Sequence, residues 1–228
     1  MRRRLVPPRL LSSALVALAG LLGALAQSAS AQQLTTPPEW RWRLDRPAQL
    51  VTGEDVPEAA WRFVSMAPGW HITTGPGVVL FHPQERATGR YSLVADFLLF
   101  PDPSDSPFGI VFGGTDLQSP NGSSLAVQLR RDGAARIIAT AAGVERELVP
   151  WQVHSAIKPH SGGGVVGNRV RVAVGTDSLR LFVNDSATVA VATTGLVTHG
   201  QFGMRIGERL NFHITTLDHV RHLAPARR

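Results

Sequence analysis

The sequence predicts an all-β protein built as a sandwich or a barrel of antiparallel strands. From Trp61 onward no segment has a convincing helical period, whereas several short runs place apolar residues at every second position. Clusters of turn-forming residues separate these runs at nearly regular spacing, which is typical of sandwiches and barrels. The fold class therefore follows from the alternation and from the turns.

Five runs show the alternation that half-buried strands require. Their apolar residues are Tyr91, Leu93, Ala95, Phe97 and Leu99; Leu125, Val127 and Leu129; Val170, Val172 and Val174; Leu179, Leu181 and Val183; and Phe202, Met204 and Ile206. Successive side chains of a strand point to opposite faces, so we expect these residues in the core and their neighbours outside. Asn184-Asp185 is expected to form a hairpin turn, since both residues tolerate a positive φ.

The N-terminal segment has the order of a secretory signal peptide. Arg2, Arg3, Arg4 and Arg9 precede an uncharged stretch from residue 14 to residue 26, and Ala29-Ser30-Ala31 follows. The apolar stretch is shorter than the roughly 20 residues that span a bilayer. We therefore expect residues 1–31 to be a signal peptide cleaved before Gln32, no stable membrane anchor afterwards, and a secreted or periplasmic protein.

Charge and cysteine content exclude several classes of function. Of the 23 Lys and Arg residues four lie before Gln32, which leaves 19 basic against 17 acidic side chains. No basic block is present, so nucleic acid is not expected as a partner. The absence of cysteine excludes disulfides, a thiolate nucleophile, cysteine-bound zinc and a lipoprotein anchor. Nothing in the sequence predicts an oligomeric state.

After cleavage about 200 residues would remain, which suits one sandwich domain. Residues 32–60 are expected to be a leader with one edge strand, in which Trp40 and Trp42 alternate with Arg41 and Arg43. Residues 61–228 are expected to form the sandwich. Core packing is the default expectation for each of the five tryptophans, with Trp151 placed for a rim position.

The order of the strands resembles the concanavalin A-like lectin/glucanase superfamily. The resemblance covers residues 61–221 and rests on segment 91–113 (YSLVADFLLFPDPSDSPFGIVFG), then SSLAVQLRRDG, NRVRVAVGTDSLRLFVNDSATVAV and GQFGMRIGERLNFHITTLDHV. Within the superfamily, laminin-G-like domains and bacterial 3-keto-disaccharide hydrolase domains are the most similar. This resemblance implies a two-sheet antiparallel jelly roll whose concave sheet face carries the ligand. Asp185 departs from the pattern, which usually has Gly there.

Polar residues that alternate with the apolar ones are the candidate ligand-binding residues. These are Asp96, Gln128, Arg130, Arg205, His213 and His71. The resemblance places Asp96 and Gln128 at polar positions of the sugar-binding face, where amide, carboxylate and guanidinium groups suit sugar hydroxyls. The alternative is a solvated sheet face with cross-strand ion pairs.

No metal site or cofactor is predicted, although two groups of residues leave a metal site as an open alternative. His213 and His219 are an even number of residues apart and would share a face of one strand, whereas His222 would not. Asp116 and Asn121 flank a loop where calcium is an open alternative, as in some laminin-G-like domains. Neither group has a defined ligand motif.

Catalytic residues are not predicted. Glu145 and Glu147 are two acids of one strand, but the Glu-x-Asp-x-Glu motif of laminarinase-type glycosidases is absent, and a retaining mechanism needs two carboxyl groups about 5 Å apart. Three hypotheses remain. The first is an exported, non-catalytic recognition module for a glycan or glycoconjugate. The others are a structural or protein-interaction domain and a glycoside-cleaving enzyme of the 3-keto-disaccharide hydrolase type.

Overall fold

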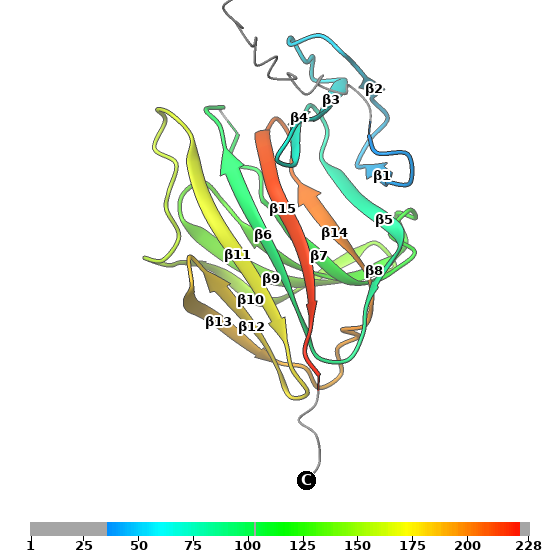
Figure 1. Cartoon of the computed structure of the whole chain (residues 1–228), viewed down its shortest axis with the longest axis vertical. Helices are drawn as coiled ribbons and strands as arrows, with labels where there is room; N and C mark the ends of the chain where they lie inside the picture. The colour runs from blue at the N-terminus through cyan, green and yellow to red at the C-terminus, as the bar shows by residue number, and fades with distance from the viewer. Residues whose placement is uncertain (1–35, 103, 224–228) are drawn as a thin grey trace, which may run out of the picture.

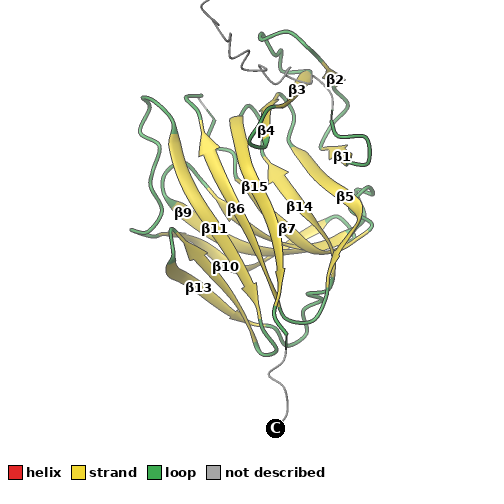
Figure 2. Ribbon diagram, in the orientation of Figure 1, coloured by secondary structure: helices red, strands yellow, loops and turns green. Residues whose placement is uncertain are grey.

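The described part of the chain contains only strands and loops, which are arranged as two stacked sheets (Figure 2). The computed structural model describes residues 36–102 and 104–223, so the predicted signal peptide lies outside the described residues. None of the described residues belongs to a helix long and apolar enough to cross a membrane. The all-β prediction is confirmed.

One sheet has seven strands in the order β1-β5-β14-β7-β8-β9-β10. Its members are β1 (Arg41–Leu44), β5 (Val78–Ala87), β14 (Gly200–Ile206), β7 (Phe108–Thr115), β8 (Ser123–Leu129), β9 (Ala134–Ala141) and β10 (Val144–Val153). All neighbouring strands in it are antiparallel.

The other sheet has eight strands in the order β13-β12-β11-β6-β15-β4-β3-β2. They are β13 (Ser186–Ala192), β12 (Ser178–Val183), β11 (Val166–Val174), β6 (Tyr91–Leu99), β15 (Asn211–Arg221), β4 (Trp70–Thr74), β3 (Ala60–Ser65) and β2 (Gln49–Leu50). Only β2 and β3 run parallel; the other pairs of this sheet are antiparallel. The chain crosses between the sheets repeatedly, for example from β5 to β6 and on to β7 (Figure 1).

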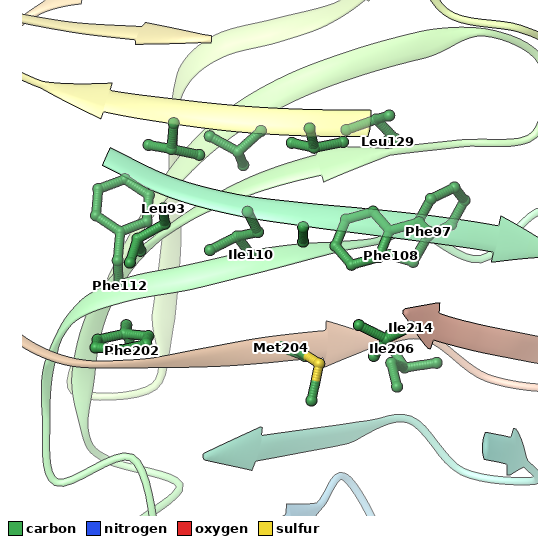
Figure 3. Packing of buried hydrophobic residues seen from close by; sticks show 14 of the residues in the cluster. Leu93, Phe97, Phe108, Ile110, Phe112, Leu129, Phe202, Met204, Ile206 and Ile214 are labelled. Atoms are coloured by element: carbon green, nitrogen blue, oxygen red, sulfur yellow. The ribbon is translucent and has the colours of Figure 1, made fainter. Parts of the chain in front are cut away.

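The core lies between the two sheets and contains the residues that the alternation predicted. Leu93 and Phe97 of β6 face Phe108 and Ile110 of β7 across the sandwich, with Met204 of β14 beside them (Figure 3). All the apolar residues of the five predicted runs are buried, with exposed fractions of 6% or less. Fully burying one large apolar side chain stabilises by about 1.5 to 3 kcal/mol, so this double layer holds the sheets together.

The predicted hairpin turn is also present. Asn184 and Asp185 have φ of 47° and 66° and join β12 to β13, as a type I′ turn requires. The Asn184 side chain donates a hydrogen bond of 2.8 Å to the carbonyl of Ala156, which anchors the turn to a distant loop. Asp185 therefore fills the usual glycine position without loss of the turn.

The segment predicted as a leader contributes to both sheets. β1 is the edge strand of the seven-stranded sheet, and β2 is the edge strand of the eight-stranded sheet (Figure 1). Trp40 packs on Trp70 with ring centroids 5.0 Å apart, and Trp42 packs on Trp61 at 5.4 Å. The sandwich thus begins before residue 61, and these tryptophan pairs close one side of it.

Candidate functional site

A hollow lies on the outer face of the seven-stranded sheet, the face turned away from the core. Its cavity volume is about 220 Å³. Its lining comprises Arg43, Asp45, Val79, Val111, Leu117, Ser119, Pro120, Gly122, Ser124, Ala126, Gln128, Ile138, Thr140, Gly143, Glu145 and Arg205. This volume is smaller than the roughly 300 to 1,000 Å³ of sites that enclose drug-sized ligands.

The strand register explains where the polar groups of the hollow come from. One row of paired positions crosses six strands and contains, from β1 to β9, Arg43, Val79, Arg205, Gly109, Gln128 and Arg136. At the usual spacing of about 4.8 Å, the five strands from β1 to β8 span about 19 Å. Gly109 lets the backbones of β7 and β8 approach closely, since a Cβ there would lie 2.0 Å from the carbonyl oxygen of Val127.

Small and apolar residues form the floor beside this row. The next row contains Gly203 of β14, Val111 of β7, Ala126 of β8 and Ile138 of β9. The three side chains of this row are nearly buried, at 3%, 5% and 2% exposure for Val111, Ala126 and Ile138. The hollow therefore has an apolar floor and a polar border.

The loop of residues 116–122, which joins β7 to β8, forms one wall. Leu117 packs on the outer face of the sheet in a small buried cluster with Val79, Phe81 and Val111. Two turn hydrogen bonds hold the loop: Ser119 N donates to Asp116 O at 3.0 Å, and Gly122 N donates to Ser119 O at 3.1 Å. A Cβ on Gly122 would lie 2.2 Å from Asp116 O, so the loop needs glycine there.

Strand β1 forms the facing wall and is tied to the same loop. The Arg43 Nε donates to the carbonyl of Leu117 at 3.1 Å, and the Gln118 amide donates to the carbonyl of Trp42 at 2.9 Å. Beyond β1, Asp45 accepts two hydrogen bonds from Arg205, at 2.9 and 2.6 Å. Residues from opposite ends of the chain thus build one end of the hollow.

Arg43 carries the unusual electrostatics of the hollow. Burial lowers the pKa of its guanidinium, and the nearby charge of Arg205 lowers it further, while the Asp45 carboxylate acts in the opposite direction. The net direction is downward from the ordinary value of an arginine. A partly desolvated cation beside another cation is the arrangement that produces such a shift.

At the other end of the row Gln128 is held by Arg136. The Arg136 Nε donates to Gln128 Oε1 at 2.7 Å, and its terminal nitrogens reach Glu145 and Glu147 at 3.3 and 3.4 Å. Gln128 is only 2% exposed, and among the described residues its amide nitrogen has no acceptor. That N–H group therefore remains free for a ligand in the hollow.

Trp151 lies further along the same face, on β10. The guanidinium groups of Arg130 and Arg136 lie 4.4 and 4.8 Å from its ring centroid. Arg130, just past the end of β8, also donates to Asp132 at 2.6 Å. The ring is half-buried by these contacts, so it orders the two arginines and is not an open stacking platform.

The remaining three predicted site residues lie on the opposite side of the molecule. Asp96, His71 and His213 belong to β6, β4 and β15 and face outward from the eight-stranded sheet. Asp96 accepts from Arg169 at 2.7 Å and from the Thr216 hydroxyl at 3.3 Å, a cross-strand arrangement of the kind expected for a solvated face.

His71 and His213 line a second, more apolar hollow together with Glu54, Arg62, Val64, Met66, Ala67, Pro68, Leu98 and Phe100. The ring centroids of the two histidines are 5.9 Å apart, and His213 Nε2 donates to the carbonyl of Pro68 at 2.9 Å. Burial lowers the pKa of His71, and the charges of His213 and Arg62 act in the same direction.

The expectation that the six residues share one binding face is therefore wrong. Gln128, Arg130 and Arg205 lie on the seven-stranded sheet, whereas Asp96, His71 and His213 lie on the eight-stranded sheet. Alternation predicts correctly that each side chain points away from the core. It does not say which sheet a strand joins, because both sheets have a polar outer face.

The expectation that His213 and His219 share a face is also wrong. An irregularity between Ile214 and Thr216 shifts the pairing of β15 with β6, so that His213 pairs with Leu98 and His219 with Leu93. An extra residue in a strand inverts the parity of all later residues in that strand. His219 consequently packs against Tyr91 and Phe202, with distances between ring centroids of 5.6 and 5.3 Å.

Within residues 36–102 and 104–223, no group of three or more histidine, aspartate or glutamate side chains is placed to hold a metal ion. In the loop that Asp116 and Asn121 flank, the Asp116 carbonyl accepts from Ser119 N. The Ser119 hydroxyl accepts from Asn121 N at 3.1 Å. These hydrogen bonds explain the conformation of the loop. Calcium binding at this loop stays a prediction.

Two residues that line the hollow, Arg43 and Asp45, and Arg136, which holds Gln128, were not singled out as candidates from the sequence. Arg43 had a visible signal, because it alternates with Trp40 and Trp42 and so had to face away from them. Asp45 and Arg136 had none, since their partners Arg205 and Gln128 are found only through the register of the sheet.

No family model matches the chain, and no curated protein sequence matches it. Solved structures match the chain. The chain is similar to the carbohydrate-binding module CBM66 from Bacillus subtilis, with a TM-score of 0.53 and 8% identity over 79% of this chain and 95% of that one.

It is also similar to the exoplasmic/lumenal domain of VIP36 in a Ca²⁺- and mannose-bound form, with a TM-score of 0.55, 10% identity and coverage of 83% and 86% of the two chains. A third similar structure is a GH16 protein of a mixed-linkage glucan PUL from Bacteroides ovatus, in complex with a product. There the TM-score is 0.55 and the identity 7%, over 82% of this chain and 97% of that one. At these identities the likeness establishes the fold: the chain is a concanavalin A-like jelly-roll sandwich.

Proposed function

We propose that this protein is an exported module that binds a glycan, without cleaving it, in the hollow on the outer face of the seven-stranded sheet. The observation that carries this proposal is Gln128. A primary amide that is only 2% exposed, with one end fixed by Arg136 and its N–H group turned to a hollow, is a ready hydrogen-bond donor for a ligand. A ligand in the hollow can therefore accept a hydrogen bond from this nitrogen.

The rest of the lining suits a sugar. Ser124 and Thr140 are directly paired across β8 and β9 and supply two hydroxyl groups. The apolar floor of Val111, Ala126 and Ile138 offers a surface for the C–H face of a sugar ring. A span of five strands accommodates an oligosaccharide better than a single compact metabolite.

The similar structures support the same class of ligand. One of them is a carbohydrate-binding module, one is a mannose-bound lumenal domain and one is a complex with an oligosaccharide product. Export is supported by the signal-peptide pattern of residues 1–31. Both observations agree with a protein that meets glycans outside the cytoplasm.

The arrangement of the carboxylates favours binding of a glycan without cleavage. The hollow is lined by two, Asp45 and Glu145, and both are held in ion pairs, with Arg205 and Arg136. Glycoside hydrolysis needs one carboxyl group as a proton donor and a second as nucleophile or base. Here Glu145 and Glu147 share one arginine instead of flanking the hollow.

The test is a glycan array on the form that begins at Gln32, followed by calorimetry on two variants. Gln128→Ala should weaken binding about tenfold, as loss of a hydrogen bond to a buried group predicts. Asp96→Ala removes a polar group from the outer face of the other sheet and should leave binding unchanged. If no glycan binds, or if both variants lose affinity equally, the proposal is wrong.

A further inference from the structure

The positive and negative charges that line the hollow are not balanced at its β1 end. Four charged residues contribute to it: Arg43, Asp45, Arg205 and Glu145. Asp45 gives both of its oxygens to Arg205, at 2.9 and 2.6 Å. Glu145 lies on β10, at the far end from β1, and is paired with Arg136. The β1 end of the hollow therefore keeps one uncompensated positive charge, on Arg43.

Arg43 is placed to use that charge on a ligand. Its Nε is taken by the neutral carbonyl of Leu117, and within the described residues no carboxylate lies within 4.0 Å of its guanidinium. Its side chain is half-buried between β1 and the loop, which limits how well water can solvate it. Burial and the neighbouring Arg205 lower its pKa, and the opposing effect of Asp45 is the smallest of the three.

We propose that the hollow selects glycans that carry a carboxylate, and that Arg43 binds this carboxylate while Gln128 binds hydroxyl groups further along the chain of sugars. The inference rests on the proposed function, and it names the ligand class: acidic oligosaccharides built from uronic acids. The planar guanidinium matches a carboxylate in a two-point arrangement, which a lysine does not provide.

The lining favours an extended sugar acid over a compact anion. Along the row of paired positions, Val79 and Gly109 separate the polar residues, so that Arg43 and Gln128 lie four strands apart. A ligand that reaches both must be extended.

The test compares three forms of one oligosaccharide by calorimetry: an oligogalacturonate, its methyl ester and the neutral oligogalactoside of equal length. Sulfated oligogalactoside of that length is a fourth arm, because sulfate is the other common glycan anion. Wild-type protein should bind the oligogalacturonate at least tenfold more tightly than the ester or the neutral form, with affinity that falls as salt rises.

Arg43→Gln should abolish that tenfold preference, whereas Arg41→Gln should keep it. Arg41 is the matched control because it lies two residues away on the same strand and face, is exposed, and does not line the hollow. Thermal unfolding of both variants checks the fold. Should Arg43→Gln fail to fold, Arg43→Lys retains the charge without the two-point geometry and should lose most of the preference.

The outcomes separate this inference from the proposed function. Equal affinity for the acid, the ester and the neutral form overturns the inference and leaves glycan binding in place. A preference for the sulfated form over the uronate, or equal losses in Arg43→Gln and Arg41→Gln, also overturns it. Binding of no glycan on the array or in calorimetry overturns the proposed function together with the inference.

Discussion

Arg205 and Asp45 form a two-point ion pair, with nitrogen-to-oxygen distances of 2.9 and 2.6 Å, that joins β14 to the residue following β1. The pair lies against the backbone of Gly77, just before β5. It connects positions 160 residues apart in the sequence and fixes one end of the hollow. The first strand is therefore part of the site as well as part of the sandwich.

The contact with Gly77 gives a first prediction. A Cβ at position 77 would lie 2.4 Å from Asp45 Oδ2 and 3.0 Å from an Arg205 nitrogen, so Gly77→Ala must displace the pair. We expect a loss of about 1 kcal/mol or less in the free energy of unfolding, because the clashing atoms are the ends of flexible side chains and a partly exposed ion pair contributes little. In an Asp45→Ala background the same substitution should cost much less. Gly53→Ala, where nothing lies within 4 Å, is the control in urea unfolding.

A second prediction concerns the core. Leu181 has no exposed surface and Arg180 beside it is exposed on the other face of β12. Leu181→Ala should cost about 2 to 5 kcal/mol in the free energy of unfolding, because it removes core packing and leaves a cavity. Arg180→Ala should stay within about 0.5 kcal/mol. Equal shifts of the two urea midpoints would show that the faces of this strand are assigned wrongly.

A third prediction concerns strand β1. Trp42 packs on Trp61 at 5.4 Å, and its backbone carbonyl accepts a hydrogen bond from Gln118 in the wall of the hollow. Trp42→Ala should lower the free energy of unfolding by an amount near the lower end of about 3 to 5 kcal/mol. Thermal and urea unfolding measure this, with Arg41→Ala as the exposed control on the same strand.

The same contacts bear on a deletion of residues 32–45. From the sequence, we expect ligand binding to survive this deletion, since the site is placed away from the Trp40/Trp42 leader. The proposed function predicts the opposite, because Arg43 and Asp45 line the hollow. Glycan affinity retained by the truncated protein would place the binding site elsewhere.

A fourth prediction concerns pH. Burial lowers the pKa of His71 and of His219, and the Nε2 of His219 is buried without a partner among the described residues. In the unfolded chain both titrate near the ordinary value of 6.5, so below that pH the unfolded state takes up protons first. The free energy of unfolding should therefore be full above about pH 6.5 and fall as the pH drops from there toward the lower pKa values of the folded state.

Proton NMR titration of the histidine C2 protons measures both pKa values directly, and urea unfolding at the two ends of that range measures the stability. His71→Gln with His219→Gln should reduce the fall in stability. Histidine pKa values at or above 6.5 would contradict the burial of these rings.

The sequence by itself determined which side chains enter the core. Alternation in segments such as 91–99 and 179–183 is a local property, because each residue of a strand points opposite to its neighbour. The turn at Asn184-Asp185 is equally local, since it depends on which residues tolerate a positive φ. These features, and with them the sandwich architecture, are confirmed by the structure.

Only the tertiary structure decided which outward residues lie together. Asp96 and Gln128 have the same pattern in their strands, yet they lie on opposite sides of the molecule, because strand pairing across the chain assigns β6 and β8 to different sheets. The bulge in β15 then separates His213 from His219. The row from Arg43 to Arg136 exists because six strands with distant positions in the chain are in register, and register depends on long-range pairing energies that no local pattern contains.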